Sequence, residues 1–387
     1  MIQAGSQLHQ LMRQWRQDIH ANPETAYQEH RTSKIVADLL RSFGLETHTG
    51  LAQTGVVAVL DGRLGPGGSI GLRADMDALN LQELNTFAHR SCVDGKMHAC
   101  GHDGHTAMLL GAAKYLSENP DFSGRVVFIF QPAEEGEAGA KAMCDEGLFE
   151  QFPVDAIYGM HNWPALQAGQ FAVHAGPVMA AMDFFDIHIT GNGAHAGMPH
   201  LGVDPIVVAG QLITSLQSIV ARTLNPADSG VLSITQMRGG DAYNVIPNTV
   251  SLGGTVRSFS SKVQQQIQSA MQSQIEQICA AFGATGVLEY RRLAPATVND
   301  SEHADICASA AQSLVGEASV LRHEQPSMGA EDFAYMLQHK PGAYIWIGNG
   351  SQDNDKSLHN PRYDFNDEIS ALGASYWVSL VREVLAA

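Results

Sequence analysis

The densest group of side chains that could bind a metal lies in residues 97–106, which read Met-His-Ala-Cys-Gly-His-Asp-Gly-His-Thr. This segment holds one thiol, three imidazoles and one carboxylate, the ligand types of transition-metal sites. Packing alone would explain a single buried Cys or a single His near a helix start, and that alternative stays open for each residue taken alone. Five such groups in ten residues instead predict a metal site.

Cys100 and His102 are two residues apart, a spacing that puts both side chains on one side of extended or turn backbone. A helix is expected to begin just afterwards, with Asp103 as its N-cap. The metal would therefore lie near a helix N-terminus, where the helix dipole lowers the pKa of a thiol. The predicted buried face of this helix consists of Ala107, Leu109, Leu110, Ala113 and Leu116.

Polar residues also end three predicted strands, over residues 69–75, 124–131 and 154–161. The first strand ends at Asp75, the second leads into Glu134 and Glu135, and the third ends at His161. Asp75 could equally be a cap or turn residue, and the glutamates could belong to a solvated acidic loop. Strands that alternate with helices and end in polar residues nevertheless predict an α/β sheet with a site at one edge.

A fourth segment, residues 358–361, adds His359, so that the candidate ligands are Cys100, His102, Glu135, His161 and His359. Five ligands fit two divalent ions better than one, because a single catalytic zinc takes three protein ligands and an open position. Thiolate and imidazole favour Zn, Ni or Co over Mg, and Mn remains open. The neighbouring Glu134 would then be free to act as a base on water.

The length of 387 residues predicts two domains. The pattern changes near residue 182, where strands and helices follow in the order β-α-β-β-α-β of the ferredoxin-like motif. We therefore expect an α/β fold in which a catalytic sheet domain, residues 1–181 and 296–387, carries an inserted ferredoxin-like lid and dimerisation domain, residues 182–295.

The formal charge is −17, and no basic stripe is present, which argues against binding to nucleic acid or to an anionic membrane. The N-terminus has no signal sequence, and we find no apolar run of membrane length. Five cysteines without a secretory signal argue against a disulfide framework. These features predict a cytoplasmic protein.

Eight motifs, in order along nearly the whole chain, resemble the hippurate hydrolase and indoleacetyl-amino-acid hydrolase branch of the dinuclear aminoacylase/carboxypeptidase family. They are residues 72–79, 97–106, 131–135, 159–161, 193–200, 244–248, 254–257 and 358–361. The chain departs from the usual pattern at Asn80, where relatives commonly have Pro, and over residues 85–90. Neither departure touches a candidate ligand.

The resemblance implies that Cys100 bridges two metal ions and that Glu134 is the general base. It also implies that His195, on the lid, stabilises the oxyanion in the active site of a partner subunit, and that Asn244 and Arg257 bind substrate. Simpler roles remain open for these three residues, as an exposed turn histidine, a turn asparagine and a surface cation. A homodimer or higher homo-oligomer through the lid follows from the proposed role of His195.

The function implied is metal-dependent hydrolysis of N-acyl amino acids, such as hippurate-like conjugates, to a carboxylic acid and an amino acid. A peptidase or a deacetylase of N-acetylated metabolites would use the same dinuclear site with a different acyl pocket. A metal-binding protein that has lost the reaction is a third possibility, which the presence of Glu134 beside all five ligands disfavours.

Overall fold

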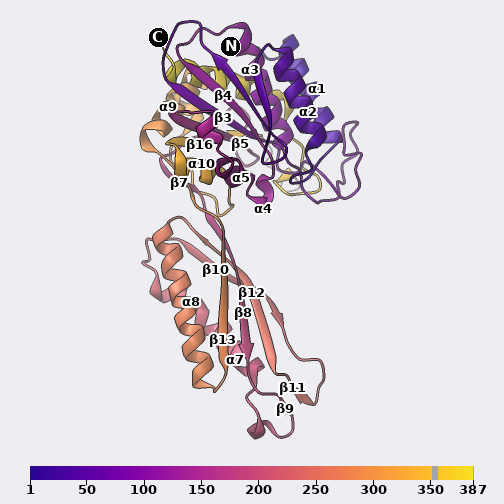
Figure 1. Ribbon diagram of the computed structural model, residues 1–387, viewed down its shortest axis with the longest axis vertical. Helices are drawn as coiled ribbons and strands as arrows, with labels where there is room; N and C mark the ends of the chain where they lie inside the picture. Colours follow the sequence, from indigo (N-terminus) through magenta and orange to yellow (C-terminus); the bar gives the residue numbers. More distant parts are fainter. Residues whose placement is uncertain (351–355, 387) are drawn as a thin grey trace. The chain divides into compact units, whose positions relative to one another are not determined.

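The structure is a computed structural model that describes residues 1–350 and 356–386. The chain divides into two compact units. Unit 1 combines residues 1–178, 298–325 and 332–387, and unit 2 combines residues 179–297 and 326–331. The predicted insert, residues 182–295, lies within unit 2. Each unit has a mixed α/β composition, and the two are described separately below (Figure 1).

Unit 1 is built on an eight-stranded sheet with the order β1-β2-β4-β3-β5-β16-β6-β15. Its four central strands, β4, β3, β5 and β16, run parallel to one another, whereas β2 pairs antiparallel with β4. The strands are β1 (Glu46–Leu51), β2 (Gly55–Asp61), β3 (Ser69–Asp75), β4 (Arg125–Gln131), β5 (Ala156–Trp163), β6 (Phe171–Ala172), β15 (Val320–Leu321) and β16 (Gly342–Gly348).

The central strands are buried almost along their whole length. Because successive side chains of a strand point to opposite faces, this burial means that both faces of the sheet are covered. The helices of unit 1 are α1 (Gln7–Ala21), α2 (His30–Ser42), α3 (His102–Glu118), α4 (Glu134–Glu137), α5 (Gly139–Asp145), α6 (Leu148–Gln151), α9 (Ser301–Val315), α10 (Phe333–His339) and α11 (Ser370–Val384). Short 3-10 turns lie at η3 (Glu317–Ser319) and η5 (Asp367–Ile369).

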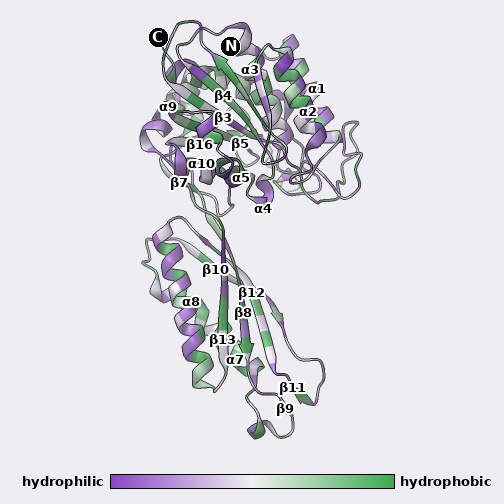
Figure 2. Ribbon diagram, viewed as in Figure 1, coloured by the Kyte–Doolittle hydropathy of each residue, from purple (hydrophilic) through white to green (hydrophobic). Residues whose placement is uncertain are grey.

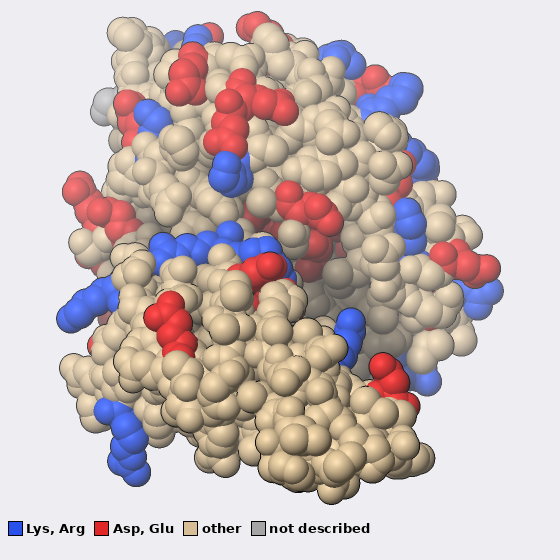
Figure 3. Space-filling view, turned by 60° about the horizontal axis from the view of Figure 1, so that its bottom comes forward, with Lys and Arg blue, Asp and Glu red and all other residues tan. Residues whose placement is uncertain are grey.

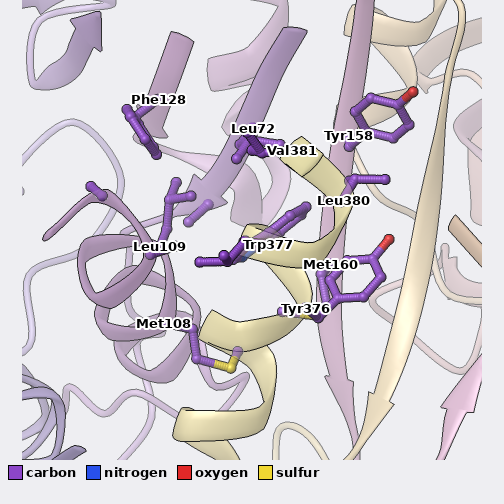
Figure 4. Close-up of a cluster of buried hydrophobic side chains, with 14 of the residues drawn as sticks. Leu72, Met108, Leu109, Phe128, Tyr158, Met160, Tyr376, Trp377, Leu380 and Val381 are labelled. Carbon is purple, nitrogen blue, oxygen red and sulfur yellow. The ribbon is translucent and has the colours of Figure 1, made fainter. Parts of the chain in front are cut away.

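The core of unit 1 lies between the central strands and two helices, α3 and α11 (Figure 4). Trp377 of α11 and Leu109 of α3 are buried there together with Leu72 of β3 and Phe128 of β4. Figure 2 colours each residue by its hydropathy. The central strands of unit 1 are apolar, whereas the visible side of α8 in unit 2 is largely polar. This core fixes the start of α3 against the sheet.

Unit 2 has a four-stranded antiparallel sheet with the order β10-β12-β8-β13, on which α7 and α8 pack. The ferredoxin-like order predicted from the sequence is therefore confirmed. Its elements are β8 (Ala181–Thr190), β9 (Ala194–His195), η1 (Pro199–Leu201), α7 (Pro205–Ser218), the π-helical turn η2 (Ile219–Thr223), β10 (Gly230–Arg238), β11 (Val245–Ile246), β12 (Thr249–Ser258), α8 (Ser261–Ala281) and β13 (Thr285–Ala294). Strands β7 (Gly176–Met179) and β14 (Thr297–Asn299) lie where the chain passes from one unit to the other.

The segment Pro205–Thr223 is the exception to the expectation of no apolar run of membrane length. It is long and apolar enough to cross a membrane by length and composition alone, a test that the core helix of a soluble protein also passes. Val208, Leu212 and Leu216 of this segment are buried in the core of unit 2.

On the face shown in Figure 3, acidic and basic side chains are scattered among large areas that carry neither.

Two details differ from the sequence-based expectations. Strand β1 was not predicted, because its residues Glu-Thr-His-Thr-Gly-Leu lack a regular apolar alternation and lie at the edge of the sheet. Asp103 is not the N-cap of α3, since the helix begins at His102 and Gly101 occupies the cap position. Asp103 is instead fully buried in the first turn, where its carboxylate contacts the ring of His20 at 2.8 Å. The prediction failed because this carboxylate has a tertiary partner that competes with a capping role.

Candidate metal centre

The parallel strands of unit 1 end at one edge of the sheet, and the candidate ligands come from strand ends, helix starts and loops at this edge. Cys100 and His102 flank Gly101, whose backbone is left-handed with φ of 97°. A Cβ at Gly101 would lie 2.1 Å from Nδ2 of Asn162, so the close approach of the two segments requires glycine there. Glu135 follows β4, His161 lies in β5, and His359 follows β16.

Two groups of ligand atoms share the thiol of Cys100. In the first group, one atom each from Cys100, His102 and His161 lies within 4.8 Å of the others. In the second group, the same holds for Cys100, Glu135 and His359. The structure thus brings together all five side chains that the sequence singled out, in two sets with one common member.

Hydrogen bonds from Nδ1 to backbone oxygens orient the imidazoles of His102 and His161 toward this shared thiol. Nδ1 of His161 lies 2.6 Å from the carbonyl oxygen of Asn162, and its Nε2 lies 3.3 Å from Sγ of Cys100. Nδ1 of His102 lies 2.9 Å from the carbonyl oxygen of Asp77. Each ring therefore donates from Nδ1 to the backbone and presents Nε2 to the site, which is the usual arrangement of a histidine that binds a metal.

The donor atoms are those that divalent transition metals prefer, and one of them makes no hydrogen bond among the described residues. Nε2 of His102 is buried and has no hydrogen-bond partner among the described residues. A buried polar atom without a partner is costly, and a metal ion would satisfy it. His359 is positioned differently, because its side chain is 55% exposed and its backbone has φ of 62°, with Nε2 at 3.2 Å from Oε1 of Glu135.

The pKa values of the candidate ligands would couple metal binding to the release of protons. Burial and the nearby carboxylate of Glu135 raise the pKa of the Cys100 thiol well above its usual value. The lower pKa expected from the helix dipole is therefore wrong, because burial and the carboxylates outweigh the dipole. Burial opposes protonation of His102, but Asp75 and Asp77 outweigh it and raise the pKa of His102 to about 10. Burial also holds the pKa of His161 well below its usual value. Because thiolate and neutral imidazole are the forms that bind metals, ions would displace protons from Cys100 and His102.

Glu134 lies beside the same atoms, at the start of a short turn rather than in a regular helix. One carboxylate oxygen lies within 4.8 Å of ligand atoms of both His102 and Glu135. The side chain is half-buried, and its Oε1 lies 3.4 Å from the backbone nitrogen of Asp332. This carboxylate can therefore reach a water molecule held between the two ligand groups.

Two further residues, Asp77 and Asn162, support the centre and were missed by the sequence-based prediction. Asp77 holds His102 through its carbonyl oxygen and accepts a hydrogen bond from the backbone nitrogen of Glu135 at 3.0 Å. The side-chain amide of Asn162 donates to the carbonyl oxygen of Cys100 at 2.6 Å. The Asp-Met-Asp sequence at the end of β3 was a signal for Asp77, whereas nothing in the sequence marked Asn162.

Asp75 was expected beside the metal, and its carboxylate lies 3.7 Å from Nε2 of His102. Its other oxygen lies 2.6 Å from Nδ1 of His105, whose Nε2 accepts from the backbone nitrogen of Asn162 at 2.9 Å. His105 is therefore engaged on both nitrogens. His98 is buried, and neither of its ring nitrogens has a hydrogen-bond partner among the described residues.

The three predicted residues of the insert lie at opposite ends of unit 2. His195 and Asn244 both line an open pocket of about 1070 Å³ at the tip, which we define as residues 191–203 and 238–248. Arg257 is half-buried near the other end of β12, opposite Met182. Because Thr249 begins this strand, the eight intervening steps place Arg257 roughly 26 Å from the tip. The two groups cannot contact one small ligand within a single unit 2.

Comparison with known proteins gives a consistent result. Residues 71–383 match the model of Peptidase family M20/M25/M40. The chain is 40% identical to a hippurate hydrolase of Campylobacter jejuni, covering 96% of this chain and 95% of that protein. It is 38% identical to an N-acetylcysteine deacetylase of Bacillus subtilis, covering 99% of both. A solved dinuclear metal-binding peptidase of the M20 family from Bacillus subtilis superposes with a TM-score of 0.86 at 35% identity, covering 98% of both chains.

Proposed function

The chain belongs to Peptidase family M20/M25/M40 and is a metal-dependent amidohydrolase, and we propose that the side chains around Cys100 carry out its reaction. The reaction is hydrolysis of the amide bond of N-acyl amino acids to a carboxylic acid and an amino acid. The resemblance seen in the sequence motifs is thereby confirmed. The observation that carries the assignment of residues is the pair of ligand groups that share one thiol, with Glu134 beside them.

Two divalent ions, Zn, Mn, Ni or Co, would be held by these groups. The residues that would hold them are Cys100 with His102 and His161 in one group, and Cys100 with Glu135 and His359 in the other. Divalent ions at these residues would supply Lewis-acid chemistry, which lowers the pKa of a water molecule and polarises a carbonyl group. Nε2 of His102 is buried without a hydrogen-bond partner among the described residues, and this atom together with the thiol, imidazole and carboxylate donors supports the fit.

Glu134 is the proton carrier in this proposal. Its carboxylate takes a proton from the attacking water and delivers it to the nitrogen of the leaving amino acid, as a general base and then a general acid. The neighbouring Glu135 is held apart from this task, because its backbone nitrogen is bound by Asp77 and its side chain faces His359. Two adjacent carboxylates thus have two roles.

The insert supplies the remaining contacts. His195 would donate a hydrogen bond to the oxyanion of the tetrahedral intermediate, and Asn244 and Arg257 would bind the substrate. Since Arg257 and the tip lie roughly 26 Å apart in one unit 2, we propose that they serve the active sites of different subunits of a homodimer. Exposed apolar side chains at the tip, among them Leu201 at 62% and Tyr243, are consistent with burial against a second chain.

The proposal does not specify the acyl group of the substrate. A hippurate-like or other aryl conjugate is one candidate, and an N-acetylated amino acid or a peptide is the alternative that the deacetylase relative supports. Initial rates with benzoyl, indoleacetyl, acetyl and dipeptide substrates would separate these classes. A chain that binds metal but hydrolyses none of them would contradict the assignment as an amidohydrolase.

Replacement of Glu134 tests the proposed chemistry. In Glu134→Gln the carboxylate that moves the proton is lost, so kcat should fall by about 10²–10⁴-fold. The metal content should stay at the wild-type value, because Glu134 is not a ligand in this proposal. Glu137→Gln is the matched control, since Glu137 is an exposed residue of the same turn. Wild-type turnover in Glu134→Gln would refute the role of this residue as the base.

A further inference from the structure

The turn that carries Glu134 and Glu135 has backbone angles that its own residues do not favour. It begins at Ala133 and ends at Ala138, and both residues have left-handed backbone, with φ of 56° and 55°. Glu135 and Gly136 between them also depart from helical backbone angles. Left-handed alanines persist only where surrounding contacts impose them. The conformation that places the two glutamates must therefore be set by residues outside the turn.

Glu29, at the start of α2, makes the contact at the beginning of this turn. Its Oε1 accepts a hydrogen bond from the backbone nitrogen of Ala133 at 2.9 Å, directly before Glu134. The same oxygen accepts from the nitrogen of Tyr27 at 3.1 Å, and Oε2 accepts from Oγ1 of Thr54 at 2.6 Å. Glu29 is fully buried. A buried carboxylate that is held by three neutral donors forms strong, directional hydrogen bonds and resists displacement.

Tyr27 makes a contact at the other end of the turn. Its hydroxyl donates to the carbonyl oxygen of Glu137 at 3.0 Å, and its own backbone is left-handed with φ of 58°. Tyr27 and Glu29 therefore form hydrogen bonds with the turn on both sides of Glu134 and Glu135. More than 100 residues separate the two segments along the chain.

We propose that Glu29 is a positioning residue, which fixes the backbone of Ala133 and so aims the carboxylates of Glu134 and Glu135 at the centre. This inference rests on the proposed function, in which those two carboxylates are the base and a ligand. Glu29 itself touches neither substrate nor metal. Its contribution is the geometry of the turn, and a displacement of about 1 Å at a reacting group can cost about 10²-fold in rate.

The test compares Glu29→Ala with Glu29→Gln and Glu24→Ala. Loss of the carboxylate should lower kcat by about 10–100-fold with KM changed less than about threefold. Glu29→Gln should restore most of the rate, since its amide oxygen can still accept from Ala133 and its amide nitrogen can donate to Thr54. Hydrogen exchange of the peptide over residues 132–139 should quicken in Glu29→Ala, which reports on the turn independently of activity.

Glu24→Ala is the matched control, because the Glu24 side chain caps α2 through the nitrogens of Arg31 and Thr32 and does not contact the turn. It should lower the thermal midpoint without changing kcat or the exchange of residues 132–139. If Glu29→Ala fails to fold, Glu29→Asp replaces it, since the shorter side chain draws the carboxylate away from Ala133.

An unchanged kcat in Glu29→Ala, or an equal loss in Glu24→Ala, would overturn the proposal. Failure of Glu29→Gln to restore the rate would also overturn it. These results differ from a failure of the proposed function itself. In that case Glu134→Gln would retain turnover, whatever Glu29 does.

Discussion

The two regions that the proposed reaction needs, the sheet edge of unit 1 and the tip of unit 2, are built in opposite ways. At the sheet edge, His102 and His161 are buried and donate from Nδ1 to backbone oxygens, which leaves Nε2 facing the shared thiol. At the tip, His195 is exposed, and its Nδ1 accepts from the nearby nitrogen of Gly197 at 3.0 Å. Asn244 is exposed as well.

This difference agrees with the proposal that one half of the site lies within a single chain and the other half acts between chains. The side chains of the proposed metal site are held by tertiary contacts within unit 1, and such preorganisation is how catalytic groups gain their effect. In the proposed homodimer, the tip would contribute its exposed polar groups to the active site of a second chain. Changes at the sheet edge should therefore act within one chain, whereas changes at the tip should act between chains.

The largest effect that separates the two regions should come from His195→Ala. Loss of an oxyanion donor is expected to lower kcat by about 10²–10³-fold without loss of metal. A mixture of His195→Ala and Glu134→Gln chains tests the division between chains. Random exchange in a homodimer yields mixed dimers with one intact site each, so activity should recover to about a quarter of the wild-type value. No recovery, despite subunit exchange verified by mass, would place His195 in its own chain's site.

Asp77→Asn should produce a smaller effect, confined to the sheet edge. The change leaves the carbonyl contact to His102 but removes the negative charge of the carboxylate, which lies 3.3 Å from Nδ1 of His102 and accepts from the nitrogen of Glu135. Loss of such a supporting group typically costs about 10–100-fold in metal affinity. Competition with a chelator measures the affinity, and Asp241→Asn, at the exposed tip, is the control. Equal affinities in the two variants would show that Asp77 does not organise the ligands.

The smallest effect on catalysis should come from a substitution of His20, whose ring contacts Asp103 in the first turn of α3. Burial opposes its protonation, but contacts to Asp103 and Glu83 raise the pKa of His20 to about 9. A raised pKa stabilises the fold fully below pH 6.5, and this contribution is lost as the pH rises through about 9. The shift corresponds to about 3 kcal/mol of unfolding free energy.

Denaturant titrations between pH 6 and pH 10 measure this contribution. Wild type should lose stability over this range relative to His20→Gln, while kcat at pH 7 stays within a few-fold. His200→Gln, at the exposed tip, should keep the wild-type pH dependence. An identical pH dependence of stability in wild type and His20→Gln would contradict the role of the His20–Asp103 pair.

Residue types and strand ends were enough to predict the sheet edge. The strand that ends at Asp75 and those that lead to Glu134 and His161 indicated a shared edge, because parallel strands bring their carboxyl ends together. Contacts between distant segments could not be predicted in this way. The Asp103 carboxylate meets His20, and the Glu29 carboxylate meets the nitrogen of Ala133, through packing that no local pattern encodes. The separation of Arg257 from His195 likewise became apparent only from the strand register.

The central claim is that two metal ions share the thiol of Cys100 in unit 1, and the metal-to-chain ratio of wild type and Cys100→Ala tests it most directly. The ratio is measured by elemental analysis after dialysis, in parallel with turnover. Wild type should hold two ions per chain, and Cys100→Ala should lose ions from both ligand sets together with its activity. One ion per chain in wild type, or two ions retained in Cys100→Ala, would contradict the claim.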